Sequence, residues 1–224
     1  MWPTDEAALV RAQTAIAAAV PPPWGPPPHP VVGGCWVCFP RGQSGPGAAG
    51  DPAWAAAVAM REERLLAGRV VTGVAGAAYV PGLLALRIGA LLEQAVRGLP
   101  SAPDVLLLDA TGADHPRRAG LAVHLGAELD VPTVGITHRP LLGRGEWPVD
   151  ERGARTPLRV DGTTVGCWLR TQPEVRPLVV HPGWRVDLDT AVGLVLATTR
   201  HRRTPEPLRR ARHRARLARA ASDG

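Results

Sequence analysis

Apolar and polar residues follow two different periods along this chain, and the change between them marks its organisation. Three strand-like apolar runs come first, separated by a glycine-rich turn (42–50) and by the polar residues 61–64, which predicts an antiparallel meander. From Leu84 to Leu99 apolar residues then recur every three or four positions, which predicts a helix of about four turns. The three strands are expected at residues 31–39, 54–60 and 69–74.

The next part of the chain alternates short apolar runs with helical patterns. A buried strand at 104–109, a helix at 119–128 and a strand at 131–137 indicate parallel strands joined by helical crossovers. The polar segment 142–156 is typical of a loop. Further elements are expected at 158–160, 165–170, 178–180 and 188–198, and in a last helix that starts near Pro205, with Asp187 and Thr204 as N-caps. Periodicity alone therefore predicts a mixed α/β sheet flanked by helices.

The two ends of the chain differ from its middle. An alanine-rich helix is expected at 5–19, followed by a stiff proline-rich linker. The segment from Arg200 to Arg219 contains nine arginines and a single acid, Glu206. This composition suits either a phosphate-binding surface or a solvated helix. We divide the chain into an N-terminal helix and linker (1–30), an α/β domain (31–200) and an arginine-rich C-terminal helix or tail (201–224).

Composition adds several constraints. A length of 224 residues suits one domain, and the net charge of +6 comes from arginine alone, because the chain has no lysine. Cys35 and Cys38 lie three apart on a strand, so they point to opposite faces and do not form a metal pair. The N-terminus lacks a basic leader and no apolar run is long enough for a membrane span. We expect a soluble, cytoplasmic monomer without a membrane partner.

Two short segments carry the candidate chemistry. The first is Tyr79-Val80-Pro81-Gly82, a turn directly before the predicted helix. The second begins with Asp109 at the end of an apolar strand and continues through a glycine turn to His115, Arg117 and Arg118. Such a segment brings an oxygen ligand for a metal ion, an imidazole and two guanidinium groups to one edge of a sheet.

Together the two segments resemble the endonuclease V family, whose members cut nucleic acid beside deaminated bases such as hypoxanthine. The resemblance runs in order from about Val31 to Arg219 and includes Thr204-Pro205-Glu206-Pro207-Leu208-Arg209. It implies a ribonuclease H-like fold, in which an antiparallel three-stranded meander is followed by parallel strands. It also implies Mg²⁺-dependent hydrolysis of DNA or RNA that contains deaminated bases.

The chain departs from the family pattern at most of the expected chemical groups. Trp36 stands in place of the first-strand aspartate, Ile88 in place of the helix glutamate, His138 in place of a lysine and Trp184 in place of a later histidine. Asp109 is the one carboxylate ligand that remains, and a single carboxylate holds Mg²⁺ weakly. We therefore expect weak or absent metal binding at Asp109. The indoles of Trp36 and Trp184 would make the former site bulky and apolar, or Trp36 is an ordinary core residue.

The recognition elements of the family are better preserved. The resemblance implies a rigid wedge at Tyr79 and Pro81 that fills the space left by an extruded base, with His115 near the scissile phosphate. The arginines that follow could contact phosphates. The predicted catalytic residues are Asp109 and His115, with Asp109 as the metal ligand. The predicted nucleic-acid-binding residues are Tyr79, Pro81, Gly82, His115, Arg117, Arg118 and His138.

Three functions remain open at this point. The first is a relative of endonuclease V that recognises deaminated bases with weakened or lost hydrolysis. The second is a working nuclease in DNA repair, with Asp114, Asp187 or Asp189 rebuilding a metal site around Asp109. The third is a non-enzymatic interaction protein on the same fold.

Overall fold

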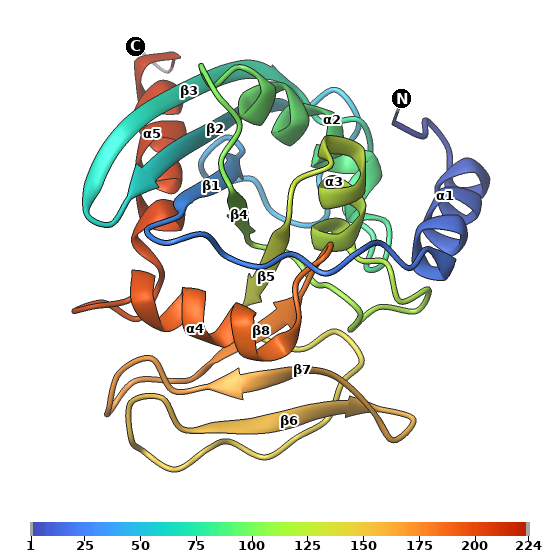
Figure 1. Cartoon of the computed structure of the whole chain (residues 1–224). Helices are drawn as coiled ribbons and strands as arrows, with labels where there is room; N and C mark the ends of the chain where they lie inside the picture. The colour runs from blue at the N-terminus through green and yellow to red at the C-terminus, as the bar shows by residue number, and fades with distance from the viewer. Residues whose placement is uncertain (1, 223–224) are drawn as a thin grey trace.

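An eight-stranded mixed sheet forms the centre of the computed structural model, which describes residues 2–222 (Figure 1). The strands follow the spatial order β3-β2-β1-β4-β5-β8-β7-β6. Their bounds are β1 Val31–Cys38, β2 Pro52–Arg61, β3 Arg64–Val74, β4 Val105–Leu108, β5 Thr133–Thr137, β6 Arg155–Val160, β7 Thr163–Leu169 and β8 Leu178–Pro182. The helices are α1 Glu6–Ala18, α2 Leu84–Arg97, α3 Leu121–Leu129, α4 Leu188–Thr198 and α5 Glu206–Ser222.

The pairing of the strands confirms the predicted mixed sheet. β1, β2 and β3 form the antiparallel meander, and β1, β4 and β5 run parallel, with Cys35 opposite Leu108 and Leu108 opposite Gly135. β8, β7 and β6 complete the sheet by antiparallel pairing. β3 begins earlier than its apolar pattern indicates, because the hairpin turns within Glu62 and Glu63, where Glu62 has a φ of 53°.

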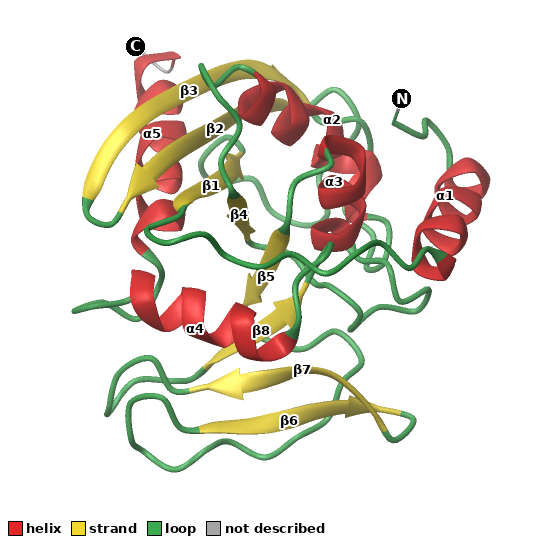
Figure 2. Cartoon of the chain, viewed as in Figure 1, coloured by secondary structure: helices red, strands yellow, loops and turns green. Residues whose placement is uncertain are grey.

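Helices cover both faces of the sheet (Figure 2). α1, α2 and α3 lie on one face, whose core includes Cys35, Leu106 and Leu108, and α4 and α5 lie on the other face, whose core includes Val105 and Leu107. Residues next to each other along a strand thus pack into the cores on opposite faces of the sheet. Consistent with this alternation, Cys35 and Cys38 lie in different clusters.

Helix α5 is packed closely onto the first strand. Leu208, Ala211 and Ala215 are buried at the contact. The start of the helix lies so near β1 that a Cβ atom at Gly34 would collide with the backbone of Pro207. The arginine-rich end of the chain therefore lies beside the residues that follow Gly34 on the same face of β1.

The linker between α1 and β1 passes across the sheet in extended conformation (Figure 1). It is held there by Trp24, whose backbone N–H donates to the carbonyl of Arg185 at 2.7 Å. Of the helices between residues 2 and 222, none has the length and apolar content that a bilayer span requires.

Candidate nucleic-acid interface

A cavity of about 440 Å³ opens at the carboxyl ends of the parallel strands. This volume falls within the usual range for small-ligand pockets, about 300–1,000 Å³. One wall comes from the turn before α2, a second from the residues after β4, a third from the residues after β5, and Gln13 of α1 closes one side. The predicted residues Tyr79, Gly82, Asp109 and His115 all line it.

The turn before α2 has an exposed aromatic side chain, Tyr79, and a backbone held in place by buried hydrogen bonds. Tyr79 is 46% exposed, and Gly82 adopts a φ of +82°, a conformation that favours glycine. The imidazole of His115 is buried beneath this turn, where its Nε2 donates to the carbonyl of Gly82 at 3.0 Å and its Nδ1 accepts from the N–H of Arg117. Burial lowers the pKa of His115 to about 4, so the ring is neutral at pH 7.

Arg117 also holds the turn. Its guanidinium donates to the carbonyl of Gly82 at 2.6 Å and to the side-chain oxygen of Gln13 at 2.6 Å. Arg118 lies nearer the surface, where it forms an ion pair with Asp161 at 3.4 Å. A contact of either arginine with phosphate stays a prediction, since in the free protein both guanidinium groups have protein partners.

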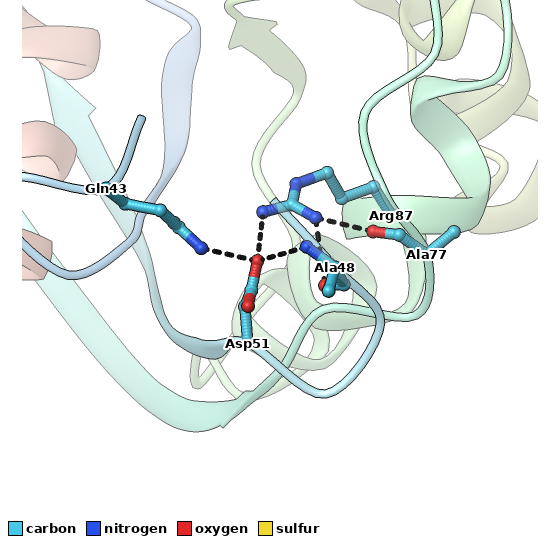
Figure 3. Close-up of polar contacts among 5 residues, drawn as sticks. All are labelled: Gln43, Ala48, Asp51, Ala77 and Arg87. Carbon is cyan, nitrogen blue, oxygen red and sulfur yellow. Dashed lines mark hydrogen bonds and ion pairs between the residues drawn. The ribbon is translucent and has the colours of Figure 1, made fainter. Parts of the chain in front are cut away.

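An ion pair with a buried arginine fixes the other end of the turn (Figure 3). Arg87 on α2 is 5% exposed and pairs with Asp51 at 3.0 Å. It also donates to the carbonyls of Ala48 and Ala77, and so connects the glycine-rich loop before β2 with the loop before the turn. The Asp51 carboxylate also accepts from the backbone N–H of Ala48 and from Gln43, and the bonds from Ala48, Arg87 and Gln43 lower the pKa of Asp51.

Asp114 shapes the opposite wall of the pocket. Its carboxylate is fully buried and accepts three backbone N–H groups, from Leu141, Leu142 and Gly143, at 2.7 to 2.8 Å. Backbone donors around a carboxylate stabilise its ionised form. Asp114 therefore fixes the loop after β5, and both of its oxygens are already used by this loop.

A much smaller cavity lies beside the first, on the face of the sheet that α5 covers. Its lining includes Asp109, Trp36, His138 and Arg212. The guanidinium carbon of Arg212 lies 5.6 Å from the centre of the Trp36 ring, within the range of a cation–π contact. Desolvation by the surrounding protein raises the pKa of the Asp109 carboxyl to about 6, and the positive charge of Arg212 opposes this shift. The residue as a whole keeps an exposed surface at the rim of the site.

These residues do not fit a divalent cation. Within the part of the chain that the structure describes, no three His, Cys, Asp or Glu side chains are grouped to hold a metal ion. Trp36 and Ile88 provide no oxygen, and Ile88 packs against the core beneath α2. A guanidinium near the remaining carboxylate also opposes a second cation there.

The other candidate carboxylates serve elsewhere. Asp187 caps α4 through the N–H and hydroxyl of Thr190, each at 2.8 Å. Asp189 forms an ion pair with Arg155 at 2.6 Å. Together with the position of Asp114, this places none of the three suggested carboxylates in a metal-binding group with Asp109.

The expectation that Trp184 shares the site with Trp36 is wrong. Trp184 is hydrogen-bonded to Thr133 at the start of β5, whereas Asp109 lies level with the end of that strand. The reason is the antiparallel direction of β8, which carries the chain back toward the amino end of β5. His181, from the same motif, lies nearer the site and is hydrogen-bonded to Thr137 at 3.0 Å.

Several residues of the site have no signal in the sequence. Gln13 is a single amide in an alanine-rich helix, and Arg212 is one of nine similar arginines. Thr111 and Arg139 also line the pocket, at positions set by loops rather than by a periodic pattern. Asp114 is named from the sequence only as a possible metal ligand, and nothing in the sequence indicates that it holds the loop after β5.

A second large cavity, of about 720 Å³, lies near the start of β1 and away from these residues. Its charged lining is largely paired within the protein. Arg200 pairs with Glu63 at 2.9 Å, and Glu206 accepts from Arg209 and Arg210. None of the predicted site residues lines this cavity.

Comparison with known proteins places this site in context. The sequence model of the endonuclease V family matches residues 26–213. Endonuclease V of Methanopyrus kandleri is 45% identical over 162 residues, which are 71% of this chain and 70% of that protein. Endonuclease V of Streptomyces avermitilis has a crystal structure that superposes with a TM-score of 0.89 at 34% identity, covering 100% of this chain and 96% of that one.

A more distant structural neighbour is endonuclease V of Ciona intestinalis. It is 20% identical, with a TM-score of 0.77 over 95% of this chain and 96% of that chain, and was crystallised with a 24mer DNA that contains an inosine. The likeness at this identity concerns the fold. On the family match and the identity to the Methanopyrus and Streptomyces proteins, the chain belongs to the endonuclease V family.

Proposed function

We propose that this protein recognises a deaminated base, such as the hypoxanthine of inosine, in DNA or RNA, and that its phosphodiester hydrolysis is weakened or lost. One observation carries the proposal. The Tyr79 turn borders an open pocket of about 440 Å³, whereas the neighbouring small cavity holds Trp36 and Arg212 beside the single carboxylate of Asp109.

The pocket suits a base taken out of its stack. Leu84, Ala85 and Leu121 provide apolar contact, and Gln13 and Thr111 provide polar groups at the walls. Tyr79 stands exposed at the rim, where an aromatic ring can fill the gap left by an extruded base. Binding of inosine-containing DNA by the Ciona relative supports the same use of the fold.

Hydrolysis is the part of the family activity that the residues around Asp109 support least. A hard cation that activates water is normally held by more than one oxygen ligand when substrate is absent. Asp109 alone, with Arg212 nearby, is a poor substitute. We therefore expect Mg²⁺ or Mn²⁺ to support little or no strand cleavage.

A binding and cleavage assay tests the proposal. Fluorescence anisotropy compares oligonucleotides that contain one inosine with matched adenine and guanine versions, and gels report nicking with Mg²⁺ or Mn²⁺. We expect a preference for inosine of about tenfold, or about 1.4 kcal/mol. Leu84→Trp should fill the pocket and remove this preference, whereas Leu66→Trp, at an exposed position on β3, should keep it.

The alternatives give different results. Efficient nicking that disappears in Asp109→Ala would establish the working nuclease. Binding that does not distinguish inosine contradicts recognition of a deaminated base. Binding that is absent, or insensitive to salt, indicates the interaction protein, because phosphate contacts make affinity fall steeply with salt.

A further inference from the structure

Arg212 occupies a position that the function proposed above leaves unexplained. It is a partly buried guanidinium on α5, in the same small cavity as Asp109, and this cavity adjoins the base pocket because Asp109 lines both. The cavity itself, at about 10 Å³, has no room for a ligand of its own. A group that contacts Arg212 would therefore lie outside this cavity, and at the edge shared with the base pocket it would also lie beside a bound base.

The position of this guanidinium is fixed by packing. α5 is anchored by the buried side chains of Leu208, Ala211 and Ala215, and its start is held against β1 at Gly34. The indole of Trp36, two residues further on the same face of β1, lies under the guanidinium. Trp36, which stands where the family resemblance places an aspartate, thus supplies a platform for a cation of the protein itself.

The charges around the site leave Arg212 able to accept an anion. No ion pair within 4.0 Å joins Arg212 to an acid anywhere in residues 2–222. The charged groups that influence it are Asp109, which is negative, and Arg209 and Arg216, which are positive. His138 adds no charge at pH 7, since burial and the nearby Arg203 and Arg212 lower its pKa. The surroundings are therefore net positive.

We propose that Arg212 binds a backbone phosphate next to the base held in the neighbouring pocket, so that this protein holds deaminated nucleic acid without a divalent cation. The proposal rests on the function proposed above. A guanidinium presents a fork of N–H donors that matches two phosphate oxygens, and it carries its charge at all relevant pH values. Asp109 then acts as a neighbouring charge that moderates binding, not as a metal ligand.

Phosphate neutralisation tests the contact directly. A series of inosine oligonucleotides carries one uncharged methylphosphonate at each phosphate around the inosine, and each is bound in EDTA by wild type, Arg212→Ala, Arg212→Lys and Arg210→Ala. Arg210 is the matched control, because it is an exposed arginine on the same helix and is paired with Glu206. Melting temperatures verify that each variant is folded.

We expect Arg212→Ala to weaken binding about tenfold or more, as for loss of a charge-assisted hydrogen bond, with Arg212→Lys intermediate and Arg210→Ala close to wild type. The slope of log affinity against log salt should fall by about 0.7 to 0.9 in Arg212→Ala. One methylphosphonate position should weaken wild type strongly and leave Arg212→Ala unaffected. Removal of Mg²⁺ with EDTA should leave wild-type affinity unchanged.

Asp109→Asn gives an effect of opposite sign for the two kinds of site. With Arg212 as the phosphate ligand, loss of the nearby negative charge should tighten binding in EDTA. With a metal ion as the ligand, the same change should remove Mg²⁺-dependent binding. Dependence on Mg²⁺, or a methylphosphonate effect that is the same in wild type and Arg212→Ala, overturns the proposal. If binding lost its preference for inosine but remained independent of Mg²⁺ and kept a methylphosphonate effect that requires Arg212, the proposed function alone would be overturned.

Discussion

Gln13 accepts a hydrogen bond from Nε of Arg117 at 2.6 Å and thereby ties the first helix of the chain to the site. The amide is almost completely buried, at 1% exposure. Because Arg117 also donates to the carbonyl of Gly82, one guanidinium connects α1 with the turn that carries Tyr79. The N-terminal helix is therefore a wall of the pocket and a support for its rim.

Replacing Gln13 by Met should weaken both stability and binding. The change keeps the side-chain volume but leaves a buried N–H of Arg117 without its acceptor, at a cost of about 1–3 kcal/mol. Urea unfolding and anisotropy with inosine DNA measure the two effects. Thr14→Ala, at an exposed position on the same helix, is the control and should change neither. An unchanged unfolding midpoint in Gln13→Met would show that α1 does not support the site.

Asp114→Asn should loosen the loop after β5 without disturbing the sheet. An amide offers one neutral oxygen where the carboxylate accepts three N–H groups, so we expect a loss of about 2–3 kcal/mol. Hydrogen exchange of the amides of residues 141–143 should become faster, while exchange in β4 and β5 stays slow. Equal acceleration throughout would mean global destabilisation, in conflict with this local role.

Arg87→Met should release both loops that meet at the start of α2. Loss of the Arg87 donors would leave the carbonyls of Ala48 and Ala77 without these partners. We therefore expect the protein to lose at least about 2 kcal/mol of stability. Limited proteolysis should then cut within the glycine-rich loop 42–50. Arg97→Met provides the comparison, because Arg97 is an exposed arginine at the other end of the same helix. Similar losses in the two variants would contradict the argument.

Stability should fall as the pH is lowered from about 6.5 toward 4. His115 and His181 both have a pKa near 4 in the folded protein because of burial, against about 6.5 when unfolded. The unfolded chain therefore binds more protons in this range, and stability is complete only above the unfolded value. Asp109 has the opposite effect, because its pKa is raised to about 6 in the folded protein. Between pH about 4 and 6 the folded state binds more protons at Asp109 than the unfolded chain does, so this group favours folding as the pH falls.

Urea midpoints at pH 7 and pH 5 measure this dependence. His181→Gln should reduce the difference between the two midpoints, since glutamine can donate to Thr137 without titrating. Asp109→Asn should increase it, because the opposing group is removed. The same pH dependence in all three proteins would mean that other groups control it.

Gly34→Ala should displace α5. A methyl group at this position would meet the backbone of Pro207, which cannot rotate away, so a loss of more than about 2 kcal/mol is expected. The tryptophan fluorescence should also change as Arg212 moves from Trp36. Gly193→Ala on the exposed face of α4 is the control and should be neutral or stabilising by up to about 1 kcal/mol.

Local pattern was sufficient for most of the fold. The helix at 84–97 and the strands of the meander follow from periodicity, and Asp187 caps its helix as predicted. The edge β8-β7-β6 depends on which strand pairs with β5, a long-range choice that periodicity does not encode. The same limit applies to the site, since Trp36 and Trp184 look alike in the sequence but lie near opposite ends of the parallel strands.

The charged residues illustrate a further limit. Arg117 and Arg118 are adjacent, yet one supports the turn and the other pairs with Asp161. Arg212 differs from its neighbours only through the tertiary contact of α5 with β1. Such differences arise from packing between distant segments, so they become visible only in three dimensions.

The close approach of Pro207 to Gly34 also affects how the protein folds. Contacts between residues far apart in sequence slow folding, because a long loop must close before they form. Here α5 covers β1 but follows all eight strands in the sequence, so this face of β1 remains open until α5 has been synthesised. A nascent chain from which α5 has not yet emerged would expose the apolar face of β1 to other proteins, and packing of α5 would then protect this face against aggregation.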